Sequence, residues 1–126
     1  MKNPVVWFEI YVDDLHRAQK FYETVFEIEL EEIPIPKTEH SMEMRAFPSN
    51  MKSEGATGTL MKIDGVSAGG NNVLLYFRSD DCSIEEKRIE KAGGKVFRSK
   101  TSVGKFGYVT LAYDTEGNMF GIISPS

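Results

Sequence analysis

Residues 5–23, VVWFEIYVDDLHRAQKFYE, decide the fold, because they predict a β-strand that runs through a short acidic turn into a helix. Val5 to Val12 is rich in β-branched and aromatic residues, which favour strands. Successive side chains of a strand point to opposite faces, so one face is wholly apolar and suits packing under a helix. The other face carries Trp7, Glu9 and Tyr11, and we expect it to form the wall of a cavity.

The helix that follows has a start signal and an apolar stripe. Asp13 or Asp14 is expected to cap it, because a short carboxylate accepts hydrogen bonds from the free N–H groups of the first turn. The next apolar residues have helical spacing and predict an amphipathic helix of about three turns. These residues are Leu15, Ala18, Phe21, Tyr22 and Val25.

The same pattern of strand, acidic turn and helix recurs over residues 72–94, which indicates an internal duplication. Asp80 and Asp81 follow an apolar strand as Asp13 and Asp14 follow the first one. When Asp14 is aligned with Asp81, Leu74 takes the place of Trp7 and Tyr76 takes the place of Glu9.

Each predicted helix is followed by further strand candidates, so the expected order is β-α-β-β-β, repeated once. The candidates cover residues 27–32, 41–47 and 59–63 in the first half, and 95–98, 107–113 and 119–123 in the second. The polar, glycine-rich segment 64–72 is the predicted linker, between a module at 1–63 and a module at 73–126. On the strand at 41–47, Glu43 and Arg45 share a face, which we expect to look into the cleft.

Composition limits the kind of protein. The chain has 126 residues, the size of one domain, and its net charge is −4 with no basic cluster, so no nucleic-acid partner is expected. Its one cysteine, Cys82, excludes an internal disulfide and fits a reducing compartment. We see no signal peptide and no apolar run of the ~18 residues that span a bilayer. We therefore expect a cytoplasmic protein with no membrane partner.

Several of these residues together resemble the vicinal oxygen chelate superfamily, which includes glyoxalase I, extradiol dioxygenases and the bleomycin resistance proteins. The resemblance rests on Val12-Asp13-Asp14-Leu15 with Ala18 and Phe21-Tyr22, then on Gly93-Gly94-Lys95-Val96 and Asp114-x-Glu116-Gly117-Asn118. It implies an α+β fold, in which two βαβββ modules form a curled mixed sheet around a cleft, the glyoxalase/bleomycin-resistance fold. It also implies a homodimer, sometimes with modules exchanged.

The superfamily's enzymes hold a divalent metal with His and Glu side chains, and the metal acts as a Lewis acid on neighbouring substrate oxygens. The matching positions in this sequence are Trp7 and Leu74 on the first strand of each module and Gly121 on the last strand. None of these side chains can bind such a metal. His16 and His40 lie outside the strands that are expected to line the cleft. We therefore predict no metal site and no cofactor, with a divalent metal as the alternative.

The predicted ligand-binding residues are those expected at the cleft: Trp7, Glu9, Tyr11, Arg45, Leu74, Tyr76, Tyr108 and Gly121. Glu9 is the candidate general base or anchor for a ligand's donor group, and its alternative role is a structural pair with Arg45. The aromatic residues either stack on a ligand or pack in the core. Tyr108 and Lys105 flank a loop that forms a lid or an ordinary hairpin. Cys82 is expected to be structural.

Three functions fit the sequence. The first is a glyoxalase/bleomycin-resistance-like protein that binds a small organic molecule in the cleft without the usual metal. The second is a metal-dependent lyase or isomerase similar to lactoylglutathione lyase, or a dioxygenase-like enzyme. The third is a protein whose dimer surface is the working part. The empty ligand positions favour the first function over the second, and a polar Glu9 in the cleft favours it over the third.

Overall fold

The computed structural model describes residues 3–34, 42–50 and 52–126. The elements follow the predicted duplicated order: β1 (Trp7–Tyr11), α1 (Leu15–Phe26), β2 (Glu31–Glu32), β3 (Met42–Ala46), β4 (Thr57–Ile63), β5 (Tyr76–Arg78), α2 (Cys82–Ile89), β6 (Lys95–Ser102), a 3-10 turn (Gly104–Phe106), β7 (Tyr108–Tyr113) and β8 (Met119–Ser124). The α+β fold with two βαβββ units is confirmed.

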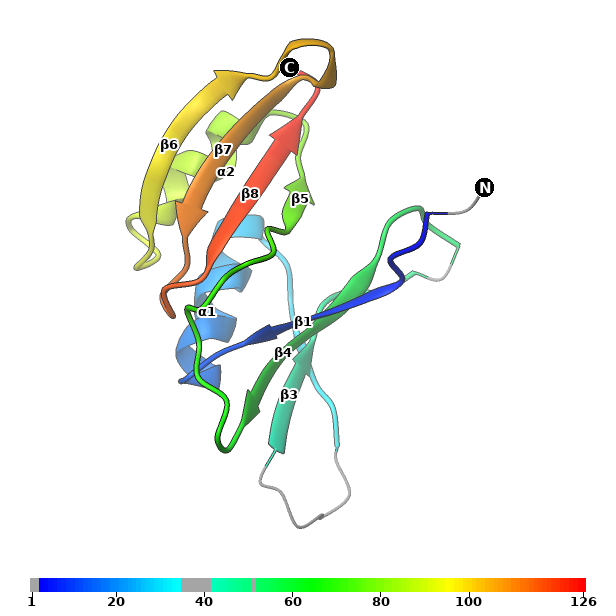
Figure 1. The fold of residues 1–126 in the computed structure, drawn as a ribbon, viewed down its shortest axis with the longest axis vertical. Coiled ribbons are helices and arrows are strands. Elements are labelled where there is room, and N and C mark those ends of the chain that lie inside the picture. The colour runs from blue at the N-terminus through cyan, green and yellow to red at the C-terminus, as the bar shows by residue number, and fades with distance from the viewer. Residues whose placement is uncertain (1–2, 35–41, 51) are drawn as a thin grey trace.

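Each unit forms its own four-stranded sheet, in the order β1-β4-β3-β2 for sheet A and β5-β8-β7-β6 for sheet B. The first and last strands of each unit are parallel neighbours, which places Glu9 beside Thr59 and Tyr76 beside Gly121. Figure 1 shows the two sheets splayed apart, with the helices packed along one face of each. The expected single curled sheet is therefore two mixed sheets that do not close on each other within one chain.

Two aspartates start the helices, as the sequence indicates. The Asp14 carboxylate accepts a hydrogen bond from the Arg17 N–H at 3.0 Å, and Asp81 accepts one from the Ser83 N–H at 3.0 Å. Helix α1 ends at Glu27, which has a left-handed backbone with φ of 53°. Of the strand predicted at 27–32, only Glu31–Glu32 is a strand in the structure.

Aromatic residues from both units meet in the core between the sheets and the helices. The Phe26 and Phe77 ring centroids lie 4.6 Å apart, and the Tyr22 ring contacts Phe47 and Phe120. Tyr22 is fully buried and Phe120 nearly so. Burial of apolar surface stabilises by about 25 cal/mol per Å², so this shared cluster holds the two units together.

The strands also differ from the predicted bounds at their ends. Strand β1 begins at Trp7, and Val5 and Val6 before it are exposed. Strand β5 begins only at Tyr76, so Leu74 lies just outside it. Strand β6 continues to Ser102, through two irregularities in its register with β7. No helix among residues 3–34, 42–50 and 52–126 is long and apolar enough to cross a membrane.

The Asp114–Asn118 turn of the second unit fastens the start of α1 in the first. The Glu116 carboxylate accepts hydrogen bonds from the Asp13 and Asp14 N–H groups at 3.0 and 2.8 Å. It also accepts one from Arg17 Nε at 2.7 Å. Burial alone raises the pKa of Glu116, but these hydrogen bonds outweigh it and lower the pKa to about 2. The turn thereby fixes the end of β1, which carries the candidate site.

Candidate functional site

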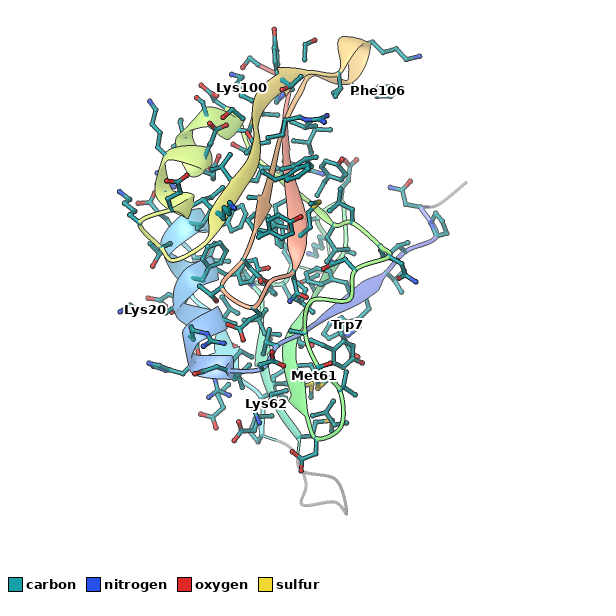
Figure 2. All side chains as sticks on the ribbon, turned by 60° about the vertical axis from the view of Figure 1, so that its left-hand side comes forward. Trp7, Lys20, Met61, Lys62, Lys100 and Phe106 are labelled. Atoms are coloured by element: carbon teal, nitrogen blue, oxygen red, sulfur yellow. The ribbon has the colours of Figure 1, made fainter. Side chains whose placement is uncertain are left out.

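The face of sheet A that α1 does not cover carries the predicted cavity wall. Trp7 and Tyr11 are 48% and 36% exposed on it, with Glu9 between them. The strand register places Thr59 and Met61 of β4 and Met44 of β3 on the same face. Figure 2 shows Trp7 and Met61 together on this sheet, far from Phe106 at the tip of the other. We call this surface, formed by Trp7, Glu9, Tyr11, Met44, Thr59 and Met61, the β1 face.

Glu9 and Tyr11 form the one hydrogen bond between side chains on the β1 face among the described residues. The Tyr11 hydroxyl donates to Glu9 Oε1 at 2.9 Å. This hydrogen bond, with a smaller effect of burial, raises the pKa of Tyr11 above its ordinary value. The bond uses one carboxylate oxygen, and the other remains able to accept a hydrogen bond from a ligand.

Thr59 is a polar residue of the β1 face that the sequence did not point to. Its side chain is fully buried, and Oγ1 has no hydrogen-bond partner among the described residues. A buried hydroxyl without a partner costs about 1–3 kcal/mol, so most such groups in folded proteins are paired. The register places Thr59 directly beside Glu9. An unpaired hydroxyl next to a carboxylate is therefore the polar centre of the β1 face.

In sheet B the corresponding pair is Tyr76 and Gly121. Tyr76 is 48% exposed, and a Cβ added at Gly121 would lie 2.5 Å from Cδ1 of its ring. The ring thus occupies the space that a side chain at position 121 would need. Leu74 precedes β5 and is half-buried. Trp7, Glu9 and Tyr11 lie together on one sheet, and Tyr76 and Gly121 lie together on the other.

Arg45 and Tyr108 do not lie where the sequence suggested. Arg45 pairs with Leu60, on the helix-facing side of sheet A, and its Nε donates to Gln19 Oε1 of α1 at 3.0 Å. It therefore does not pair with Glu9 either. Tyr108 lies near the start of α2, where Lys100 Nζ sits 4.9 Å from its ring centroid. Alternation gives two faces of a strand without saying which one the helices cover. Both residues lie on the helix-facing side, where Tyr108 is still 37% exposed.

The remaining candidates have local structural roles. Cys82 is fully buried, and its N–H donates to the Ser124 hydroxyl at 2.9 Å. Lys105 lies 5.3 Å from the ring centroid of its exposed neighbour Phe106, at the hairpin tip between β6 and β7. His16 is exposed on α1, and His40 lies outside the described residues.

A cavity of about 390 Å³ lies between the two units, beside the edge of β1. The linker and the start of β8 complete it, and the sequence predicted none of its residues except Glu9 and Tyr11. Its lining is Phe8, Glu9, Ile10, Tyr11, Tyr22, residues 67–73, Leu75, Asn118, Met119 and Phe120. The glycines and asparagines of the linker and the turn were the available signal, because they allow the backbone to approach closely.

The architecture is similar to that of several proteins of known structure. Residues 5–37 match the family model described as bleomycin resistance protein-like N-terminal. Maize glyoxalase I superposes with a TM-score of 0.72 at 23% identity, over 94% of this chain and 43% of that one. The chain has the glyoxalase/bleomycin-resistance fold. No curated protein sequence matches it.

Two further neighbours have this glyoxalase/bleomycin-resistance fold over nearly their whole length. A glyoxalase/bleomycin resistance protein from Albidiferax ferrireducens T118 superposes with a TM-score of 0.66 at 18% identity, over 97% of this chain and 99% of that chain. TnmS3, an antibiotic-binding protein from Streptomyces sp. CB03234, gives 0.65 at 22% identity, over 100% and 99%. The maize enzyme is the longer protein, and the chain spans less than half of it.

The residues that the sequence analysis matched to the superfamily's metal positions carry no metal-binding side chain. Trp7 and Leu74 offer no ligating atom, and the Tyr76 ring fills the space in front of Gly121. Across the described residues, no three His, Cys, Asp or Glu side chains are grouped so that they could hold an ion. The carboxylate of the β1 face, Glu9, stands beside a threonine and a tyrosine instead.

Proposed function

We propose that this protein binds a small, flat organic molecule on the β1 face, without a metal. The observation that carries the proposal is the arrangement of Trp7 and Tyr11, both substantially exposed, on either side of Glu9. Aromatic rings offer stacking area at a low entropy cost, and one polar group among them fixes the orientation of a ligand. The antibiotic-binding activity named for TnmS3 shows that a neighbour with this fold binds a small molecule.

Glu9 and Thr59 supply the polar contacts in this proposal. The free carboxylate oxygen of Glu9 accepts a hydrogen bond from a donor group of the ligand, such as an amine. The Thr59 hydroxyl is reached when the ligand displaces the side chains above it, and it then gains the partner that it lacks. In the enzymatic alternative, a lyase or isomerase, the same Glu9 carboxylate would take the proton.

The second part of the proposal is a homodimer. The β1 face of one chain and the uncovered face of sheet B both expose aromatic rings, from Trp7 and Tyr11 on one and Tyr76 and Phe97 on the other. Apolar patches of this kind mark interaction surfaces. A second copy would place its sheet B opposite the β1 face and close the binding site. Sedimentation velocity across protein concentrations tests this assembly, and a strictly monomeric protein would contradict it.

The binding experiment uses the single tryptophan as its reporter, because Trp7 is the only one in the sequence. Quenching of Trp7 fluorescence is measured with 9-aminoacridine, a flat amine, and with anthracene-9-carboxylate, a flat acid. We expect saturable quenching, tighter for the amine, and we expect Glu9→Gln to remove that preference. Trp7→Ala removes the stacking ring and the fluorescence signal together, so its affinity for the two compounds is measured by titration calorimetry. Affinities unchanged by both variants would contradict the proposed site.

Elemental analysis after dialysis separates the two kinds of function. The protein is offered zinc, nickel, manganese and iron, dialysed, and assayed for bound metal. Near-stoichiometric metal that survives dialysis would favour the lyase or isomerase alternative, and glyoxalase assays would follow. We expect none to be retained, since Trp7, Leu74 and Gly121 stand at the ligand positions.

A further inference from the structure

We propose that the cavity beside the edge of β1 is a second binding site, for a small flat heterocycle that carries a lactam edge, an N–H next to a C=O. Phe8 and Ile10, which point toward the helices, line this cavity together with Tyr22 and Phe120. Glu9 and Tyr11 also line it at the edge of the strand, whereas Trp7 does not. The recognition argued below uses backbone groups, so this proposal does not depend on the function assigned to the β1 face.

The backbone of β1 supplies the recognition. β1 is an edge strand, with β4 as its only neighbour in the sheet. The Val12 N–H donates to the Met61 carbonyl of β4 at 3.0 Å, and in a parallel ladder alternate residues point their backbone groups to the same side. The backbone groups of Phe8 and Ile10 thus face β4, and those of Glu9 and Tyr11 face outward along the open edge.

One contact confirms this alternation. The outward Tyr11 carbonyl accepts a hydrogen bond from Asn118 Nδ2 at 2.9 Å. The neighbouring Glu9 carbonyl and Tyr11 N–H have no partner among the residues that the structure describes. An acceptor and a donor two residues apart on a strand edge are what a lactam pairs with, through its N–H and its C=O. A ligand that fills the cavity removes water from both groups, and its amide edge then supplies the hydrogen bonds that these groups need.

The linker explains why a small molecule is expected here and not an added strand. The Ala68 N–H donates to Asp13 Oδ1 at 3.1 Å, and the Gly69 N–H donates to Asn118 Oδ1 at 2.8 Å. Asn71 accepts from the Met119 N–H at 3.1 Å. These three bonds fasten the linker beside the open edge of β1, where a further strand would have to lie. The linker runs from the end of β4 to β5 in Figure 1.

Size and polarity of the cavity fit the same ligand class. Its volume of about 390 Å³ falls in the range of about 300–1,000 Å³ that is usual for small-molecule sites. Aromatic and aliphatic residues line much of it, among them Phe8, Ile10, Leu75 and Phe120. A flat ring system packs against these side chains, and its amide edge meets the strand. Over Gly70 a Cβ would contact nothing within 4 Å, so the rim is open there.

The experiment compares 2-quinolinone with N-methyl-2-quinolinone, which keeps the ring system and the carbonyl but lacks the N–H donor. Titration calorimetry on the full chain measures both affinities. We expect 2-quinolinone to bind at least tenfold more tightly, and we expect ¹H–¹⁵N spectra to show the largest shift at the Tyr11 amide. Equal affinities, no binding of 2-quinolinone, or shifts confined to Trp7 and Thr59 would overturn the proposal.

A pair of variants tests the strand edge itself. Tyr11→Pro removes the outward N–H and leaves the ladder with β4 intact, and proline is tolerated on edge strands at such a position. Tyr11→Ala removes the same side chain and keeps the N–H. Because both variants lack the Tyr11 side chain, they differ at this edge in the N–H alone, and we expect 2-quinolinone to bind Tyr11→Pro at least tenfold less tightly than it binds Tyr11→Ala. Equal binding by the two variants would overturn the assignment of the Tyr11 N–H as the donor to the ligand. If Tyr11→Pro does not fold, the comparison of the two compounds on the wild type tests the same proposal.

Discussion

The Tyr76 ring lies directly over the α-carbon of Gly121, so close that a Cβ at position 121 would fall 2.5 Å from two of the ring's carbons. The equivalent pair in the first unit is Glu9 and Thr59, held in the same register on β1 and β4. The two units therefore have the same strand register at this position but different side chains there. In one unit a ring closes the space, and in the other a carboxylate and a hydroxyl remain side by side.

Two glycines in equivalent sheets should respond very differently to alanine. At Gly58 a Cβ would lie 2.0 Å from the Phe8 carbonyl oxygen, which is backbone and cannot move without breaking the β1–β4 pairing. At Gly121 it would meet only the exposed Tyr76 ring, which can turn away. We expect Gly58→Ala to cost about 3 kcal/mol and Gly121→Ala about 1 kcal/mol in urea unfolding. Adding Tyr76→Ala should relieve Gly121→Ala and leave Gly58→Ala unchanged.

Replacing Thr59 with valine should stabilise the protein. Valine has nearly the same shape and removes a buried hydroxyl that has no partner, so we expect the free energy of unfolding to rise by about 1 kcal/mol. The matched control is Thr110→Val. The Thr110 hydroxyl is equally buried but donates to Glu86 Oε1 at 2.9 Å, so its removal should lower the free energy of unfolding. A loss of stability in both variants would show that Thr59 has a partner in solution.

The stability of the fold should depend on Glu116 in a defined pH range. Its folded pKa of about 2 lies below the ordinary value of 4.5, so the ionised form is favoured by folding. That contribution is complete above about pH 4.5 and is lost as the pH falls through about 2. We expect Glu116→Gln to lower the free energy of unfolding by about 1–3 kcal/mol at pH 7, and less in acid. Urea titrations of both proteins from pH 7 to pH 2 measure the difference.

Asp114 should change the pH dependence of stability in the opposite direction to Glu116. Burial raises its pKa above the ordinary 3.8, although hydrogen bonds from Tyr22, Asn118 and Glu116 oppose the shift. Its neutral form is thus favoured by folding, and the contribution is present below pH 3.8 and lost as the pH rises through the folded pKa. Asp114→Asn should therefore flatten this part of the pH profile. A profile identical to that of the wild type would contradict the raised pKa.

Arg45 should be dispensable for ligand binding. It lies on the helix-facing side of sheet A and donates to Gln19, away from the β1 face. We expect Arg45→Met to leave the quenching of Trp7 by 9-aminoacridine unchanged and to lower stability by about 1 kcal/mol, the value of one lost hydrogen bond. Weaker quenching with unchanged stability would instead indicate that Arg45 contacts the ligand.

The sequence predicted the larger features because they rest on local signals. The apolar alternation of β1, the aspartate caps and the aligned Asp14 and Asp81 were sufficient for the duplicated order. They also placed Trp7, Glu9 and Tyr11 on one face. What they could not give was which face of the strand at 41–47 is covered. Phe47, two residues beyond Arg45, was the signal, since its buried ring packs on Phe8 and Tyr22.

Thr59 and the linker cavity could not be predicted, for a different reason. Both depend on which strands become neighbours and on where the linker crosses, and these are long-range facts. The β1–β4 register brings Thr59 beside Glu9, which lies fifty positions earlier in the chain, and Asn118 of the second unit contacts Tyr11 of the first. Nothing within a short window of the sequence carries that information.

The hydrogen bonds between Glu116 and the first turn of α1 also have a consequence for folding during synthesis of the chain. The carboxylate and the amides that it serves are separated by 102 and 103 positions. Until the Asp114–Asn118 turn has left the ribosome, the nascent chain presents α1 with those amides unpaired and with Tyr22 lacking its acceptor on Asp114. The first half therefore obtains these contacts only after the turn of the second half has been synthesised.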